Sequence, residues 1–157
     1  MNEVPLFSSL NIKSITLRNR IVLSPMCQYK AKDGMISDWH LQHYSRFAFS
    51  GLGAAFVEAT GVTPEGRIGH GCTGIWSDDH IEGLSKIAKT FKEYNCVSGI
   101  QLAHAGRKAS FLRPWDGASP ITQDDKVEPA WQTIGPSAIP INQNSPVPKE
   151  MSLEDIN

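Results

Sequence analysis

The stretch RIVLSPMCQY, residues 20–29, decides the fold. Ile21, Val22 and Leu23 form an apolar run without polar alternation, which is typical of a strand in a parallel sheet that is covered on both faces. Pro25 ends this strand, because its nitrogen has no hydrogen to donate and it keeps the preceding residue extended. The residues that follow therefore lie on the loop leaving the strand's carboxyl end, where α/β sheets and barrels bind their ligands.

Two further strands are expected along the chain. Residues 54–57, AAFV, form the second apolar run, and residues 96–102, CVSGIQL, form the third. A helical pattern separates each strand from the next, so the chain alternates strand and helix with short connections. This order predicts right-handed crossovers and a parallel sheet.

Both intervening segments carry apolar residues at three- and four-residue spacing, which gives each expected helix one apolar face. The first begins at Ser37-Asp38, where serine suits the N-cap and the carboxylate suits the helix start. The second begins in residues 77–82, SDDHIE, where Asp79 and Glu82 have the spacing of a capping box.

The fold class is α/β, and we expect the amino-terminal part of a (β/α)8 TIM barrel. The chain has 157 residues, whereas a complete barrel typically needs about 250. The pattern divides the chain into four parts that run in order: a hairpin at 1–19, three strands and two helices at 20–102, a long excursion loop after the third strand at 103–150, and the start of a helix at 151–157.

Charge and cysteine content narrow the class of ligand and the compartment. The net charge is -1 with both signs interspersed, which favours neither nucleic acid nor an anionic membrane surface. Three widely spaced cysteines without a C-x-x-C pair indicate a reducing compartment. No apolar run approaches the roughly 18 residues that span a bilayer. We expect a soluble cytoplasmic protein with a small-molecule ligand.

The ends of the three strands carry the candidate site, because parallel strands bring their carboxyl ends to one rim. These ends are residues 24–29, 59–61 and 101–108. A metal site is the alternative, since His40 and His43 lie one helical turn apart. They could bind a metal together with Cys72 or His70, but no further ligand follows at suitable spacing, so we expect no metal.

Several ordered motifs resemble the old yellow enzyme family of FMN-dependent NAD(P)H dehydrogenases. The cysteine after Ser-Pro-Met resembles the class often called thermophilic-like. The likeness begins at Leu6-Phe7 and covers nearly the whole chain. The motifs are SPMCQY at 24–29, VEA at 57–59, GRI at 66–68, GIWSD at 74–78 and IQLAHAGRK at 100–108.

The resemblance implies an ene-reductase that uses FMN, with NADPH or NADH as hydride donor, and a substrate with an activated double bond such as an α,β-unsaturated carbonyl. Cys27 would tune the flavin near its reactive edge, and Tyr29 would reach over the substrate. Ala59 would leave room for the ring, and Gln101 would hydrogen-bond the pyrimidine edge. The implied flavin-binding residues are Ser24, Pro25, Met26, Cys27, Ala59 and Gln101.

Other interpretations stay open at this point. Cys27 could be a small buried hydrophobe, Tyr29 a core residue, and Arg67 either a surface charge or the partner of Glu58. Arg107 and Lys108 belong to the motif without an assigned role. In the family, the substrate-binding histidines, the proton-donating tyrosine and the phosphate site lie beyond Asn157. The chain could therefore be an inactive or partner-completed half-barrel, either a homo-oligomer or one that lacks a carboxyl-terminal half. An aldolase or isomerase would need a Schiff-base lysine or paired carboxylates at the strand ends, which offer no such pair.

Overall fold

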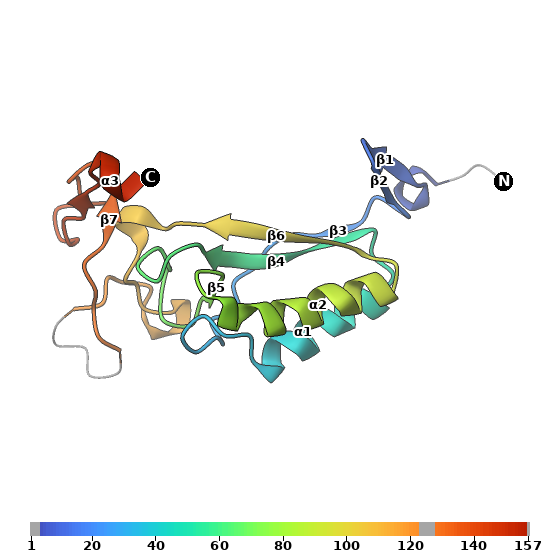
Figure 1. The fold of residues 1–157 in the computed structure, drawn as a ribbon, viewed down its shortest axis with the longest axis horizontal. Helices are drawn as coiled ribbons and strands as arrows, with labels where there is room; N and C mark the ends of the chain where they lie inside the picture. Colours follow the sequence, from blue (N-terminus) through green and yellow to red (C-terminus); the bar gives the residue numbers. More distant parts are fainter. Residues whose placement is uncertain (1–3, 123–127, 157) are drawn as a thin grey trace.

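A parallel sheet with helices against one face forms the centre of the computed structural model, which describes residues 4–122 and 128–156 (Figure 1). Positions 123–127 of the expected excursion loop and Asn157 of the expected last helix lie outside these residues. The sheet contains four strands: β3 (Val22–Leu23), β4 (Ala54–Gly61), β5 (Thr73–Gly74) and β6 (Val97–Ala103).

Strand β4 is the central strand, and all of its partners run parallel to it. Strand β6 pairs with it from Ala54 to Gly61 and so occupies one edge along its whole length. Strand β3 pairs with the start of β4 and β5 with its end, so these two share the other edge. The expected parallel order of three strands is therefore present, and the short strand β5 is an addition that the sequence pattern did not predict.

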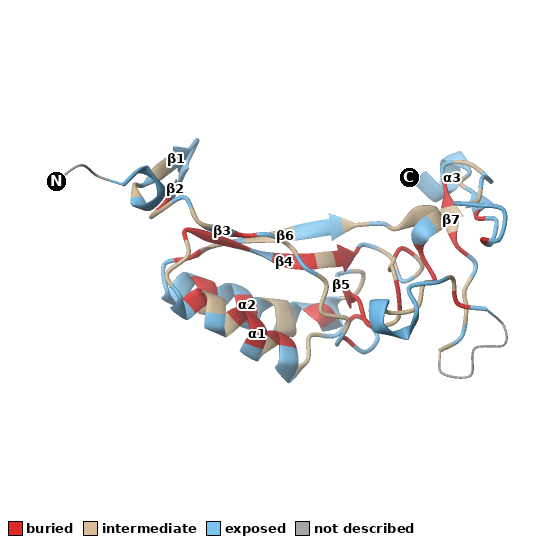
Figure 2. Cartoon of the chain, turned by 180° about the vertical axis from the view of Figure 1, so that it is seen from behind, coloured by how far each residue is buried: buried red, intermediate tan, exposed pale blue. Residues whose placement is uncertain are grey.

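Helices α1 (Asp38–Phe49) and α2 (Ile81–Glu93) pack side by side on the sheet and form the core with it. In Figure 2 the buried residues lie between these helices and the strands. The centre of this core consists of eight buried residues: Leu23, Tyr44, Ala48, Ala55, Val57, Ile87, Phe91 and Cys96.

The opposite face of the sheet is open within the described residues. Val22 is 43% exposed and Phe56 38%. The expectation of a sheet covered on both faces is therefore wrong for this chain, because both helices lie on the same side (Figure 2). An apolar run shows that a strand can be buried on two faces, but it does not show which elements supply the cover.

Helix α1 and the short 3-10 helix η2 (Asp78–His80), which leads directly into α2, begin with the same capping arrangement, in which a serine precedes a histidine by three residues. The backbone N–H of Ser37 donates to His40 Nδ1 at 3.1 Å, and that of Ser77 donates to His80 Nδ1 at 3.2 Å. The predicted capping box of Asp79 and Glu82 is wrong, because the N-cap of α2 is His80 and Ser77 caps η2. Glu82 instead pairs with Lys86 at 2.6 Å on the exposed helix surface.

Smaller elements flank the sheet at its two ends. Strands β1 (Leu10–Ile12) and β2 (Ile15–Leu17) form an antiparallel hairpin. After β6 the chain continues through short turns, a parallel pair of β7 (Ile134–Gly135) and β8 (Lys149–Glu150), and the short helix α3 (Leu153–Ile156). None of the helices within the described ranges has the length and apolar character needed to cross a membrane.

Candidate functional site at the strand ends

A β-bulge near the end of β4 sets the geometry of the rim. The register with β6 pairs Val57 with Ile100 and then Ala59 with Gln101, so Glu58 is an extra residue. Val57 and Glu58 both point toward the helices, because Val57 belongs to the core and Glu58 contacts Tyr44 of α1. The bulge thereby turns Ala59 to the open face, beside its direct partner Gln101.

Cys27 approaches the same point from the loop after β3. Its half-buried thiol contacts the backbone of Ala59 and the sulfur of Cys72. Thr73 adjoins the group, because its hydroxyl donates to the Ala59 carbonyl at 3.4 Å. The structure therefore brings Cys27, Ala59 and Gln101 together at one rim, from three separate parts of the chain.

The hydrogen bond that Cys27 donates to Cys72 governs the protonation of both thiols. It raises the pKa of Cys27, and burial acts in the same direction. It lowers the pKa of Cys72, against the opposing effect of burial. The Cys27 thiol therefore stays protonated and can donate a hydrogen bond at the half-buried position.

The loop after β3 carries the other predicted site residues on its exposed side. Ser24 is exposed, Pro25 is half-buried and Met26 is 48% exposed. Tyr29 has a positive φ of 53° and packs edge-to-face against Trp115, with ring centroids 5.8 Å apart. Burial raises the pKa of Tyr29, so its hydroxyl stays protonated and can donate a hydrogen bond.

Gln101 lies on the open face of the sheet. Its side chain is exposed, and it forms no side-chain hydrogen bond within the described part of the chain. The amide is instead a free donor and acceptor pair next to Ala59.

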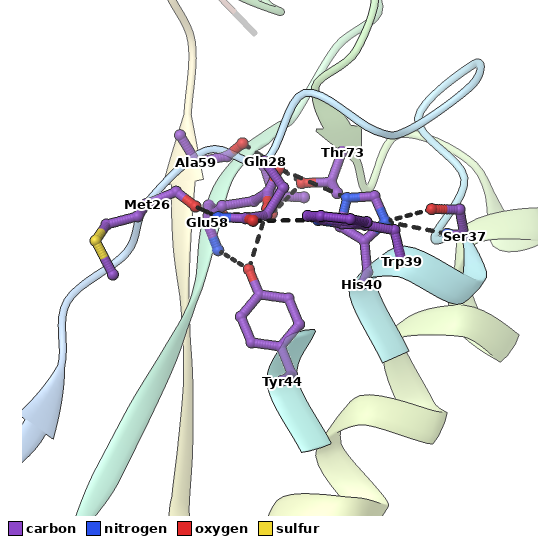
Figure 3. Close-up of polar contacts among 10 residues, drawn as sticks. Met26, Gln28, Ser37, Trp39, His40, Tyr44, Glu58, Ala59 and Thr73 are labelled. Atoms are coloured by element: carbon purple, nitrogen blue, oxygen red, sulfur yellow. Dashed lines mark hydrogen bonds and ion pairs between the residues drawn. The ribbon is translucent and has the colours of Figure 1, made fainter. Parts of the chain in front are cut away.

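A buried polar group beneath the rim was not predicted (Figure 3). Glu58 is fully buried; its Oε2 accepts from the Tyr44 hydroxyl at 3.2 Å, and its backbone N–H donates to the same hydroxyl at 2.9 Å. His40 Nε2 faces Glu58 Oε1 at 3.8 Å. A charged residue inside an apolar strand was the available signal, since a buried carboxylate needs partners from the neighbouring layer.

His40 and Arg67 have other contacts in the structure. No group of three metal-ligating side chains occurs among residues 4–122 and 128–156, and His40 serves the α1 cap. Arg67 is not the partner of Glu58. Its guanidinium lies between the rings of Trp76 and Trp131, at 5.1 and 5.4 Å, and thereby holds the excursion loop against the strand-end loops.

The class of this protein is a (β/α)-barrel fold, of which the chain forms the amino-terminal part. This class is defined by the parallel strands, the two helices on one face and the candidate site at the carboxyl ends of the strands. A sequence profile of the NADH:flavin oxidoreductase / NADH oxidase family matches residues 5–157. The chain belongs to this family.

Individual relatives agree with this assignment. The chain is 47% identical to an NADPH dehydrogenase of Geobacillus thermodenitrificans and 43% identical to one of Bacillus licheniformis, over 99% of its length in each case. It spans only 41% of each of these curated relatives. Among solved structures, the old yellow enzyme from Pichia sp. AKU4542 shares the fold, with a TM-score of 0.77, 23% identity, and coverage of 97% of this chain and 39% of that chain.

Proposed function

We propose that this chain forms one side of the FMN site of an NAD(P)H-dependent oxidoreductase of the old yellow enzyme type. The convergence of Cys27, Ala59 and Gln101 at one rim carries the proposal. FMN supplies hydride transfer when it is bound. The chain's own residues bind the flavin, orient it and supply hydrogen-bond donors around it.

The residues at the rim fit a flat heteroaromatic ring that carries amide groups along one edge. Ala59 presents a side chain small enough for a ring to lie against the strand. Gln101 offers both a donor and an acceptor, which match the carbonyl and N–H groups of a flavin pyrimidine edge. The exposed loop residues Ser24, Pro25 and Met26 would flank the ring on the side of β3.

Two further groups would act where the reactive edge of the flavin meets the substrate. The Cys27 thiol would donate to the flavin near its reactive edge, because the hydrogen bond with Cys72 keeps its proton in place. The Tyr29 hydroxyl would reach over the substrate, held by the contact of its ring with Trp115. Free thiols at this site suit a reducing compartment, so we place the protein in the cytoplasm.

The names of the relatives, which are NADPH dehydrogenases, support a nicotinamide hydride donor. NADPH or NADH would supply the hydride, and the acceptor would be an alkene activated by a carbonyl group. A neutral thiol and a neutral phenol near the reacting end suit such an uncharged acceptor, because both can donate hydrogen bonds to an oxygen.

A second candidate is a half-barrel that acts only after a partner completes it, by supplying the remaining strands or a second copy. The open apolar face of the sheet favours it, since Val22 and Phe56 are 43 and 38% exposed. Large exposed apolar patches are typical of interaction surfaces. Size-exclusion chromatography with light scattering distinguishes this candidate from a self-sufficient monomer.

Flavin titration tests the leading proposal. We expect the purified chain to quench FMN fluorescence, and Gln101→Ala to weaken binding about fivefold, which corresponds to about 1 kcal/mol for a lost hydrogen bond. Ala59→Leu should abolish binding by filling the ring position. Gln42→Ala, an exposed glutamine on α1, is the matched control. A chain that remains colourless with added FMN, or an Ala59→Leu variant that binds normally, would contradict the proposal.

A further inference from the structure

Two of the three cysteines meet at the rim, although they lie far apart in the sequence. Cys27 is on the loop after β3 and is half-buried, whereas Cys72 directly precedes β5 and is 1% exposed. Their sulfur atoms are in hydrogen-bonding contact. Cys96 is also buried, but its sulfur contacts only the neighbouring Val97 carbonyl, at 3.9 Å. All three are free thiols.

The backbone fixes this contact, because the segments that carry the two cysteines lie against each other. The Ala31 N–H donates to the Gly71 carbonyl at 3.0 Å. A Cβ atom at Gly71 would lie 2.5 Å from the carbonyl oxygen of Tyr29, so only glycine allows this approach. Cys72 follows Gly71 directly in the chain. The meeting of the thiols is therefore a consequence of main-chain packing rather than of one side-chain rotamer.

The neighbouring strand provides a second anchor for the pair. Thr73, the residue after Cys72, is completely buried, and its hydroxyl is 3.0 Å from that of Thr60 on β4. Cys27 contacts the backbone of Ala59, which adjoins Thr60. Cys27 is thus held against Ala59 of β4, and Cys72 is anchored to β4 through its neighbour Thr73, which contacts Ala59 and Thr60.

We propose that Cys27 and Cys72 form a reversible disulfide when the protein meets hydrogen peroxide. The Cys27 thiol passes its proton to the Cys72 thiolate that it contacts, and the Cys27 sulfur attacks the O–O bond. An S–O bond forms, the O–O bond breaks, and the released hydroxide takes the proton from Cys72 to become water. The Cys72 thiolate then attacks the Cys27 sulfur; the S–S bond forms, the S–O bond breaks, and the second hydroxide leaves and takes a proton from solvent to become water. Two thiols are oxidised and one peroxide is reduced to two waters.

The positions of the two thiols suit both the attack on peroxide and the formation of the disulfide. Cys27 is the more accessible sulfur, and a peroxide can reach it from the open face. Cys72 is shielded from the oxidant, but the hydrogen bond from Cys27 lowers its pKa, which favours the thiolate that resolves a sulfenic acid. The disulfide would bring the two sulfur atoms from contact to a bond of about 2.05 Å. If the proposed function holds, oxidation also removes the thiol donor from the flavin edge.

Thiol mapping tests the disulfide without any flavin, so a failure of FMN binding would leave this experiment intact. The full chain is treated with hydrogen peroxide, and the products are examined by intact mass and by peptide mapping. We expect a loss of two hydrogen atoms, about 2 Da, a Cys27–Cys72 linked peptide, and full reversal by dithiothreitol. Cys96→Ser should behave identically, whereas Cys72→Ser should stop at oxidised Cys27 without a crosslink.

A comparison with the unfolded chain shows whether the pairing depends on the fold. In 6 M guanidinium, about the concentration that unfolds most domains, the three cysteines should pair as a mixture, so a single native pairing depends on the fold. A native chain that retains three free thiols would overturn the proposal. Oxidation of Cys27 to sulfinic acid while Cys72 stays free, or a mixture of pairings in the native state, would overturn it as well.

Discussion

His40 Nε2 lies 3.8 Å from Glu58 Oε1 between α1 and β4, and neither atom has a hydrogen-bond partner in the described part of the chain. The Ser37 N–H donates to His40 Nδ1, so that nitrogen carries no proton and the ring proton is on Nε2. A neutral imidazole therefore directs its N–H at a buried carboxylate. The interaction is one of charge with dipole rather than a salt bridge, and it joins the start of α1 to the bulge that positions Ala59.

His40→Ala should destabilise the fold by about 2 to 4 kcal/mol, from about 1 for the lost cap and about 1 to 3 for a buried group without its partner. His40→Gln should recover about half of this, because an amide at the third helical position accepts from the N-cap N–H. Urea unfolding measures both changes. Gln42→Ala, on the exposed side of α1, is the control. Equal losses in both His40 variants would show that the cap contributes nothing.

Tyr44→Phe should cost about 1 to 3 kcal/mol, because one buried hydroxyl serves two groups of Glu58. Its loss leaves the Glu58 N–H and one carboxylate oxygen without a partner. Tyr94→Phe is the matched control, since Tyr94 is 44% exposed. Chemical denaturation of both variants checks the difference. Similar stability for the two would mean that water replaces the hydroxyl beneath the rim.

The sequence allowed most of the framework to be predicted, because each strand or helix is marked by residues that act locally. Pro25 ended β3 as expected, and Asn95, with a φ of 53°, follows the end of α2. Ser152 and Asp155 cap each other at the start of α3, in the range 151–157 where a helix start was expected. These features depend on side chains within one turn of each other.

Features that depend on distant packing could not be predicted. The bulge at Glu58 exists because the carboxylate needs Tyr44, which is fourteen positions earlier in the chain. Strand β5 has only two residues and is stabilised by the Thr60–Thr73 hydroxyl contact rather than by an apolar run. The exposure of Gln101 depends on what covers the open face. The meeting of Cys27 with Cys72 required the approach at Gly71.

Gly53→Ala should destabilise the start of β4 by about 1 to 3 kcal/mol through overpacking. An added Cβ would lie 2.2 Å from the Asn19 carbonyl oxygen, and the Gly53 N–H is tied to the Ile21 carbonyl at 3.0 Å. Because both contacts involve main chain, no side chain can move to relieve the clash. Gly135→Ala is the control, since its nearest atom would be 3.7 Å away. Thermal unfolding of the two variants should separate them by several degrees, and equal Tm values would contradict the packing at Asn19.

Stability should fall as the pH drops through the range below 6.5, the ordinary pKa of histidine. Burial lowers the pKa of His43, and the positive charge of Arg46 adds to this effect, although Glu58 opposes it. The unfolded chain then binds a proton at a higher pH than the folded chain does, so the free energy of unfolding rises with pH across this window and is fully present above it. His43→Gln, which cannot titrate, should reduce the difference between the urea midpoints at pH 7.5 and 5.5, roughly one unit on either side of that ordinary value. An unchanged difference in the variant would assign the pH dependence to other groups, and an NMR titration of the His43 ring would then show a pKa at or above its ordinary value.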